Sequence, residues 1–254
     1  MSNTTPTLEF TGERVLPHTA GDVLQQSLLA FHQAIYNAIA PHCAGKTVLD
    51  LGCGSGHGSA ILQRHGARLW GTDNDPTALR FAASAMPTLA GRMLASDAQR
   101  LPYPDQQFDV VCAVEVIEHV PNAAQMFAEI RRVLRPGGIC CFSTPNRLVF
   151  SPGRTQPLNP FHVVEYTHDT FATLLGEQFT EVNIQCIYLR QRSFLVRYQR
   201  AALRFELPFP LNRIERFCVW HLPFWNRQAL RPQHVALTPH YRPDCSGFFA
   251  ICTR

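Results

Sequence analysis

Two carboxylates and an imidazole stand close together in the segment Glu115-Val116-Ile117-Glu118-His119. If this segment forms a helical turn, residues 115, 118 and 119 share a face, because they are three and four positions apart. Such a mixed set of oxygen and nitrogen ligands suits Mg²⁺ or Mn²⁺ better than a metal that prefers thiolates. Without a metal, His119 could act as a general base. The plainer alternative is that Glu118 and His119 cap the next helix or line a pocket.

A second histidine, His162, lies further along in Asn159-Pro160-Phe161-His162-Val163-Val164-Glu165. Its loop follows the next expected strand, and the loops that follow neighbouring parallel strands lie at the same edge of the sheet. His162 is therefore a candidate fourth ligand or an alternative general base. A histidine in a proline-rich loop can equally be an ordinary surface residue.

A glycine-rich loop with the spacing GxGxG, Gly52-Cys53-Gly54-Ser55-Gly56, follows an apolar run that contains Asp50. Glycines permit a tight turn and let backbone N–H groups approach a nucleotide closely. The dinucleotide fingerprint GxGxxG does not fit, because His57 and Ser59 stand where its third glycine would be. The Asp50 carboxylate would repel a pyrophosphate but attract the positively charged methionine end of S-adenosylmethionine.

Short apolar runs alternate with helical spacing from Lys46 onward. Strands are expected at 47–51, 67–71, 92–95, 108–114, 138–143, 179–189 and 245–252, and helices at 22–40, 57–65, 76–85, 121–134 and 168–177. Strands that are apolar along their whole length and alternate with helices indicate a parallel sheet covered on both faces. We therefore expect a doubly wound, Rossmann-like α/β fold with a mostly parallel seven-stranded sheet, an N-terminal helical arm and a C-terminal insertion. Pro121 should open the helix at 121–134.

Charge and cysteine usage limit the partners and the compartment. The net charge of +4 is uneven, because residues 190–242 contain ten Arg but only Glu206 and Glu215 as acids. Such a segment could meet phosphate, an anionic membrane surface or an acidic substrate, or be a solvated face. Nine Cys without a CxxC pair, and an N-terminus without a leader pattern, favour the cytoplasm. No apolar run is long enough to span a bilayer, so membrane contact would be peripheral, through 190–242.

Residues 45–145 resemble the class I S-adenosylmethionine-dependent methyltransferases of the type 11/12 kind. The resemblance includes the glycine loop, Asp73 at the end of the second strand, Asp97 after the third, and the segments 101–111 and 134–138. It implies that S-adenosylmethionine is the cofactor, that Asp73 binds its ribose diol, and that Asp97 and Ala98 contact its adenine. The expected cofactor contacts are Asp50, Gly52, Cys53, Gly54, Gly56, Asp73, Asn74, Asp97, Ala98 and Glu115. The domain division is then an arm and lid helix at 1–44 and a methyltransferase domain at 45–254, with an insertion at about 190–242.

The pair Glu-x-x-Glu-His with a later His-x-x-Glu-aromatic-Thr resembles metal-dependent 2′-O-methyltransferases that act on the 3′ end of small RNAs. Similar residues occur in ubiquinone-biosynthesis O-methyltransferases. The first resemblance implies that Glu115, Glu118, His119 and His162 hold an ion, Mg²⁺ or Mn²⁺, that engages a vicinal diol of the acceptor. A bound ion would lower the pKa of a hydroxyl that is to be methylated.

The N-terminal segment 10–17 resembles the arm of methyltransferases found with bacterial glycan assembly enzymes, which favours a carbohydrate acceptor. The sequence thus predicts an O-methyltransferase with Glu118, His119 and His162 as catalytic residues and a small-molecule, glycan or glycolipid acceptor. An RNA end and a quinone precursor are enzymatic alternatives, RNA being the less favoured partner. A non-catalytic S-adenosylmethionine-binding module is the alternative from another class. Base N-methylation is disfavoured, because the fourth strand lacks an Asn/Asp-Pro-Pro-aromatic motif.

Overall fold

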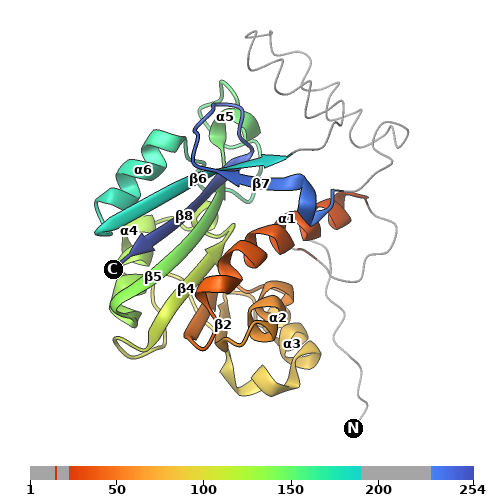
Figure 1. Cartoon of the computed structure of the whole chain (residues 1–254), viewed down its shortest axis with the longest axis vertical. Coiled ribbons are helices and arrows are strands. Elements are labelled where there is room, and N and C mark those ends of the chain that lie inside the picture. The colour runs from red at the N-terminus through yellow and green to blue at the C-terminus, as the bar shows by residue number, and fades with distance from the viewer. Residues whose placement is uncertain (1–14, 16–22, 190–229) are drawn as a thin grey trace.

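The computed structural model describes Val15, residues 23–189 and residues 230–254, which build one eight-stranded sheet with helices on both faces (Figure 1). The strands are β1 (Thr47–Leu51), β2 (Arg68–Asp73), β3 (Met93–Ala95), β4 (Phe108–Val114), β5 (Leu134–Pro145), β6 (Glu181–Leu189), β7 (Val235–Thr238) and β8 (Gly247–Thr253). The α-helices are α1 (Val23–Ile39), α2 (His57–Arg64), α3 (Pro76–Ala85), α4 (Ala123–Val133), α5 (Arg147–Phe150) and α6 (His168–Gly176). Short 3-10 helices are η1 (Ala40–His42), η2 (Pro87–Arg92), η3 (Ile117–His119) and η5 (Pro232–His234).

The strand order is β3-β2-β1-β4-β5-β8-β6-β7. Strands β1 to β5 pair in parallel, whereas β8 runs antiparallel to both β5 and β6. The predicted doubly wound, mostly parallel fold is confirmed. The number of strands was wrong by one, because residues 235–238, assigned to the insertion, pair with β6 as an antiparallel edge strand. Residues 190–229 of the predicted insertion lie outside the described residues, as do residues 1–14 and 16–22 of the arm.

Both faces of the sheet are apolar, because alternate side chains of a central strand pack into two different hydrophobic cores, one on each face. In β4, Val111 and Ala113 pack into a core with α4 and α6, while Val110 and Cys112 pack into a second core with α1, α2 and α3. Figure 1 shows these two groups of helices on opposite sides of the sheet. Burial on both faces is what uninterrupted apolar strands predict.

The helix after β4 begins later than predicted. Residue Asn122 is its N-cap and accepts a hydrogen bond from Gln125 N at 3.1 Å, so α4 begins at Ala123 and Pro121 lies before the cap. A side-chain cap satisfies a free backbone N–H of the first turn, and here it overrides the preference of proline for that turn. As a result, residues 115–121 form a connection at the carboxyl edge of the sheet, and this connection includes η3.

Candidate functional site

The glycine loop between β1 and α2 is shaped by three left-handed residues, Gly52, Gly54 and Gly56, with φ of +72°, +52° and +79°. A Cβ on Gly52 would lie 2.4 Å from Val116 Cγ2, and one on Gly56 would lie 2.4 Å from Met86 Cε. In contrast, a Cβ on Gly54 would meet nothing within 4 Å. The first and third glycines are therefore required by packing, and the middle one leaves open space beside the loop for a ligand.

Strand β2 holds this loop in place. The backbone N–H groups of Gly52 and Cys53 both donate to the Thr72 carbonyl, at 2.7 and 3.0 Å. Since the Cys53 side chain is buried, any contact of Cys53 with a cofactor would involve its backbone. Asp73 Oδ2 accepts from Gly54 N at 2.8 Å, while its Oδ1 accepts from Asp75 N at 2.9 Å. Each oxygen retains a second lone pair with which it could accept a ribose hydroxyl.

The other predicted cofactor contacts lie at the carboxyl ends of the neighbouring strands. Asn74 directly follows β2 and is exposed, while Asp97 follows β3 and is also exposed. Asp97 Oδ1 accepts from Gln99 N at 2.8 Å, and Ala98 is half-buried. Since β1, β2 and β3 are parallel neighbours, all these residues gather at one edge of the sheet. Their contacts with S-adenosylmethionine remain predictions.

Asp50 occupies a different environment from the one expected for it. Its side chain is fully buried, and its two oxygens accept hydrogen bonds from Tyr36 Oη at 2.8 Å and Ser59 Oγ at 2.5 Å. Burial raises the pKa of Asp50 to about 6, although both hydroxyls act to lower it. In this structure Asp50 thus links α1 to α2 beneath the glycine loop, and its attraction for the cofactor stays a prediction.

The N-terminal region contacts the loop at a second point, which the sequence did not indicate. Ser55 Oγ donates to the Val15 carbonyl at 2.8 Å, and His57 Nδ1 lies 3.2 Å from Ser55 Oγ. Burial lowers the pKa of His57 to about 4, so this ring is neutral at physiological pH. Tyr36 and Val15 carry no spacing signal that would connect them with a loop so distant in sequence.

The helical turn on which residues 115, 118 and 119 would share a face does not include Glu115. Its φ is +54°, and the turn η3 begins only at Ile117, so the spacing of three and four residues does not apply. Glu115 Oε1 accepts a hydrogen bond from Ser143 Oγ at 2.6 Å. It does not belong to the group of clustered ligand atoms found in the described part of the chain. Of the four residues expected to hold an ion, the other three therefore lie together without Glu115, and their role as ligands remains a prediction.

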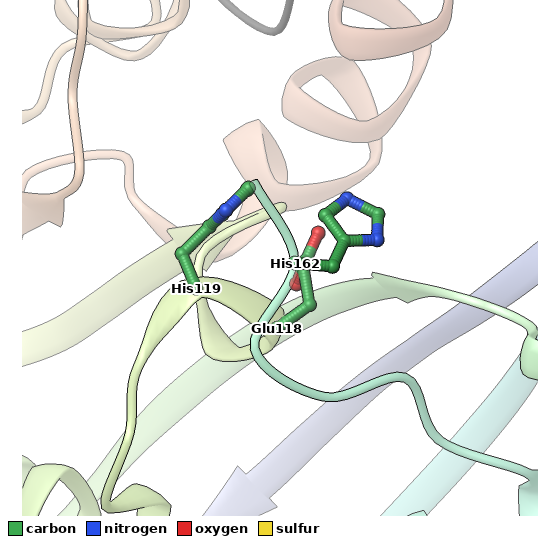
Figure 2. A group of neighbouring side chains, drawn as sticks. All are labelled: Glu118, His119 and His162. Carbon is green, nitrogen blue, oxygen red and sulfur yellow. The ribbon is translucent and has the colours of Figure 1, made fainter. Parts of the chain in front are cut away.

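That group consists of Glu118, His119 and His162, whose possible ligand atoms all lie within 4.8 Å of one another. Figure 2 shows that Glu118 and His119 come from the turn after β4 and that His162 comes from the loop crossing it. The Glu118 carbonyl fastens this loop, because it accepts from Val163 N at 2.8 Å and from Val164 N at 3.2 Å. The expectation that these three side chains share one edge of the sheet is confirmed.

The Glu118 carboxyl is buried, and its Oε2 accepts a hydrogen bond from Thr144 Oγ1 at 3.0 Å. Burial and the nearby Glu115 carboxylate raise the pKa of Glu118 well above its usual value. Burial and Glu118 likewise raise the pKa of Tyr166 to about 12. An excess of acidic groups in a poorly solvated place favours a proton or a cation.

The two histidines contact three residues that were not predicted to belong to the site, namely Phe161, Asn159 and Glu165. His119 Nδ1 lies 2.9 Å from the Phe161 carbonyl. His162 Nδ1 lies 2.8 Å from Glu165 Oε1, and His162 Nε2 lies 2.9 Å from Asn159 Nδ2. Their rings pack edge to face, with centroids 5.1 Å apart. Both rings therefore have fixed orientations beside the Glu118 carboxylate.

Apolar side chains flank this group on the loop that carries His162. Phe161 is 49% exposed and Val163 is 51% exposed, although large apolar residues are normally buried. They stand on either side of His162 in the sequence.

No α-helix among the described residues is both long and apolar enough to cross a membrane.

The family model that matches this chain is described as a methyltransferase domain and covers residues 49–142. This range begins in β1, includes the glycine loop and the Glu118-His119 turn, and ends in β5. His162 and its loop lie beyond it.

Similar proteins include a probable S-adenosylmethionine-dependent methyltransferase of Mycolicibacterium smegmatis, 39% identical over 175 residues, which are 69% of this chain and 66% of that protein. A protein of Mycobacterium tuberculosis with the same description is 37% identical, over 66% of this chain and 60% of that one. The 2-methyl-6-phytyl-1,4-hydroquinone methyltransferase of Synechocystis is 31% identical, over 63% of this chain and 52% of that enzyme. The chain thus matches a little under two thirds of the length of its mycobacterial relatives.

Solved structures share the fold. An S-adenosylmethionine-dependent methyltransferase from Thermotoga maritima has a TM-score of 0.61 at 13% identity, covering 88% of this chain and 89% of that one. A [4+2]-cyclase has a TM-score of 0.58 at 17% identity, covering 95% and 86%. At such identities the likeness concerns the fold alone, and the same fold carries different reactions.

Proposed function

We propose that this chain, which belongs to the class I S-adenosylmethionine-dependent methyltransferases, transfers a methyl group to a hydroxyl of a sugar, glycoconjugate or other small molecule. The observation that carries the proposal is the gathering of Glu118, His119 and His162 at the sheet edge that also holds the glycine loop. A hydroxyl is a weak nucleophile until a base or a cation acts on its proton, and this group offers both means.

The residues present fit S-adenosylmethionine. The open side of Gly54 leaves room for the cofactor, Asp73 has lone pairs for a ribose diol, and the exposed Asp97 can receive the adenine amino group. The bound cofactor supplies a methyl group on a positively charged sulfur, which is already activated for transfer. The task left to this chain is to hold the acceptor in line with that methyl group and to remove its proton.

His162 is the residue best placed to accept that proton. Its Nδ1 is paired with Glu165, so the acceptor oxygen would transfer its proton to Nε2. When S-adenosylmethionine is bound, the acceptor oxygen would bond to its methyl carbon as the carbon–sulfur bond breaks, which would leave a neutral thioether. The proton of the acceptor hydroxyl would move to His162 Nε2 and convert the imidazole to an imidazolium. Glu165, which lies 2.8 Å from His162 Nδ1, stabilises the positive charge that develops on His162.

The donor set also fits a divalent ion. Glu118, His119 and His162 offer one carboxylate and two imidazoles, a combination that suits Mn²⁺ better than Mg²⁺, which prefers oxygen ligands. When bound, such an ion would lower the pKa of a coordinated hydroxyl, and two neighbouring hydroxyls of a diol could share it. The sequence alone predicted either Mg²⁺ or Mn²⁺. Because Glu115 does not belong to the group, only one carboxylate remains beside two imidazoles, and this favours Mn²⁺.

A hydroquinone is the second candidate acceptor. One relative is named a 2-methyl-6-phytyl-1,4-hydroquinone methyltransferase, and the exposed Phe161 and Val163 beside His162 are suited to an apolar tail. A glycolipid would use the same apolar side chains, so both acceptors are consistent with peripheral membrane contact. That contact would also involve the basic part of 190–242.

The test uses labelled S-adenosylmethionine, the purified protein and fractionated cell extract, followed by identification of the labelled product. We expect a methyl ether on a sugar or other diol. His162→Ala should reduce the rate at least about 100-fold, as loss of a general base does. The control His42→Ala removes an exposed histidine at the end of η1 and should leave the rate unchanged. Tight cofactor binding without turnover in any fraction would support a non-catalytic binding module instead.

A further inference from the structure

Glu165 is a buried carboxylate that forms a hydrogen bond with the ring of His162. Its side chain is fully buried, and its Oε1 lies 2.8 Å from His162 Nδ1. Its Oε2 is also buried and has no hydrogen-bond partner in the structure. A buried carboxylate costs several kcal/mol of solvation unless a partner compensates it. The N–H of His162 is thus the principal compensation for Glu165.

The environment of His162 specifies where its proton lies. A carboxylate only accepts, so the nitrogen facing Glu165, Nδ1, must carry the proton. On the other side, Asn159 Oδ1 accepts from Phe161 N at 3.1 Å, which turns the amide nitrogen of Asn159 toward His162 Nε2. An amide nitrogen only donates, so Nε2 must carry the lone pair. Two independent neighbours therefore select the same tautomer.

The backbone around Glu165 is firmly attached to the rest of the fold. Tyr166 forms a parallel bridge with Asn146 at the end of β5, and its carbonyl accepts from Arg147 N at 2.9 Å. The next residue, Thr167, is the N-cap of α6 and forms a capping box with Thr170. This attachment fixes Glu165 relative to the sheet, and through Glu165 it fixes the ring of His162.

We propose that Glu165 is a positioning residue which, with Asn159, holds His162 as the tautomer whose Nε2 lone pair faces the acceptor. The Asn159 amide lies 2.9 Å from Nε2, and an acceptor hydroxyl that donates to Nε2 would take the place of this amide. One hydrogen bond to Nε2 would then replace another. The same lone pair would serve a metal ion, since partners beyond the ligands commonly orient a metal-binding histidine. This role of Glu165 rests on the proposed function of His162.

The experiment measures the tautomer directly, without an acceptor. Protein labelled with ¹⁵N in its histidines is examined at pH 8 by long-range ¹H–¹⁵N correlation, and His162→Gln identifies the signals of His162. We expect a protonated Nδ1, a bare Nε2 and a strongly deshielded Nδ1 proton. In Glu165→Gln we expect that proton signal to be lost and the tautomer ratio to fall about tenfold, because a charged hydrogen bond is replaced by a neutral one.

Two variants complete the test. Glu165→Asp keeps the carboxylate and should keep the Nδ1–H tautomer. Asp169→Asn changes a carboxylate that is 94% exposed and contacts His168 Nδ1, and it should leave the His162 signals unchanged. The proposal is overturned by a wild-type His162 protonated at Nε2, or by an unaltered tautomer in Glu165→Gln. If Glu165→Gln does not fold, the wild-type spectrum decides. If the tautomer is as expected but His162→Ala retains full methyl transfer, the proposed function fails and the positioning role stands.

Discussion

Removing the hydroxyl of Tyr36 tests whether Asp50 is a charged group that links α1 to β1 and α2. Tyr36 is 2% exposed, and its Oη donates to the fully buried Asp50 at 2.8 Å. In Tyr36→Phe the carboxylate keeps Ser59 as a donor but loses one of its two hydroxyl partners. The variant retains the ring, so the packing of α1 on α2 is preserved.

The size of the effect should depend on pH. A hydrogen bond to a charged group contributes about 1.5–3 kcal/mol, and one between neutral groups about 0.5–1.5 kcal/mol. The pKa of Asp50 is raised to about 6 in the folded protein from 3.8, so Asp50 costs stability above pH 6, and this cost decreases progressively as the pH falls from 6 to 3.8. The variant should therefore lose about 2 kcal/mol at pH 8, where Asp50 is charged, but only about 1 kcal/mol at pH 5.

The assay is urea unfolding followed by circular dichroism at both pH values, with Tyr241→Phe, a change at a 41% exposed ring, as the control. Other groups that titrate in this range, such as His57, are common to both proteins, and their effects largely cancel in the difference between wild type and variant. Equal losses at pH 8 and pH 5 would show that Asp50 is not charged in the folded protein at pH 8. A loss below about 0.5 kcal/mol at pH 8 would refute the hydrogen bond itself.

Two further changes test the packing and the ion site. Gly58→Ala places a Cβ 2.1 Å from the Tyr36 ring, and it should reduce the free energy of unfolding by about 1–3 kcal/mol, whereas Gly176→Ala, with nothing within 4 Å, should be neutral in the same urea assay. In calorimetric titration with Mn²⁺, His119→Ala should weaken binding at least about tenfold and Glu115→Gln much less, because Glu115 lies outside the cluster. Equal losses for both variants would restore Glu115 as a ligand.

The fold could be predicted from the sequence wherever a local pattern determines the element. The apolar run at 108–114 matches β4 to the residue, since a strand buried on both faces leaves few alternatives. The edge strand β7 was missed because only tertiary pairing with β6 defines it, and all four of its residues are half-buried. Its apolar and polar residues show neither a helical nor a strand period that is long enough to recognise.

Some residues of the candidate site could likewise be predicted from the sequence, whereas others could not. Residues that follow parallel strands, such as Gly54, Asp73 and Glu118, could be placed at one edge because the topology fixes where strands end. Glu115 was misplaced because a single left-handed residue interrupts the expected helical turn, and a non-glycine residue gives no warning of a positive φ. Tyr36 could not be found, because no spacing relates a residue in α1 to a carboxylate in β1.

The binding of the methyl donor and the choice of the acceptor depend on different parts of this chain. The glycine loop, which is expected to bind the donor, follows a strand end and contains glycines that packing requires, so its geometry follows from the fold. The acceptor side depends on the loop that carries Asn159, His162 and Glu165, which is fastened to the Glu118 carbonyl and to the end of β5. Changes in that loop can alter which hydroxyl is presented to His162 without disturbing the glycine loop. Exchange of residues 151–158 with a relative, which keeps Asn159 and His162, should therefore change the acceptor and leave the affinity for S-adenosylmethionine within about twofold. The reason is that the two sites share no hydrogen bond that crosses from one loop to the other among those described.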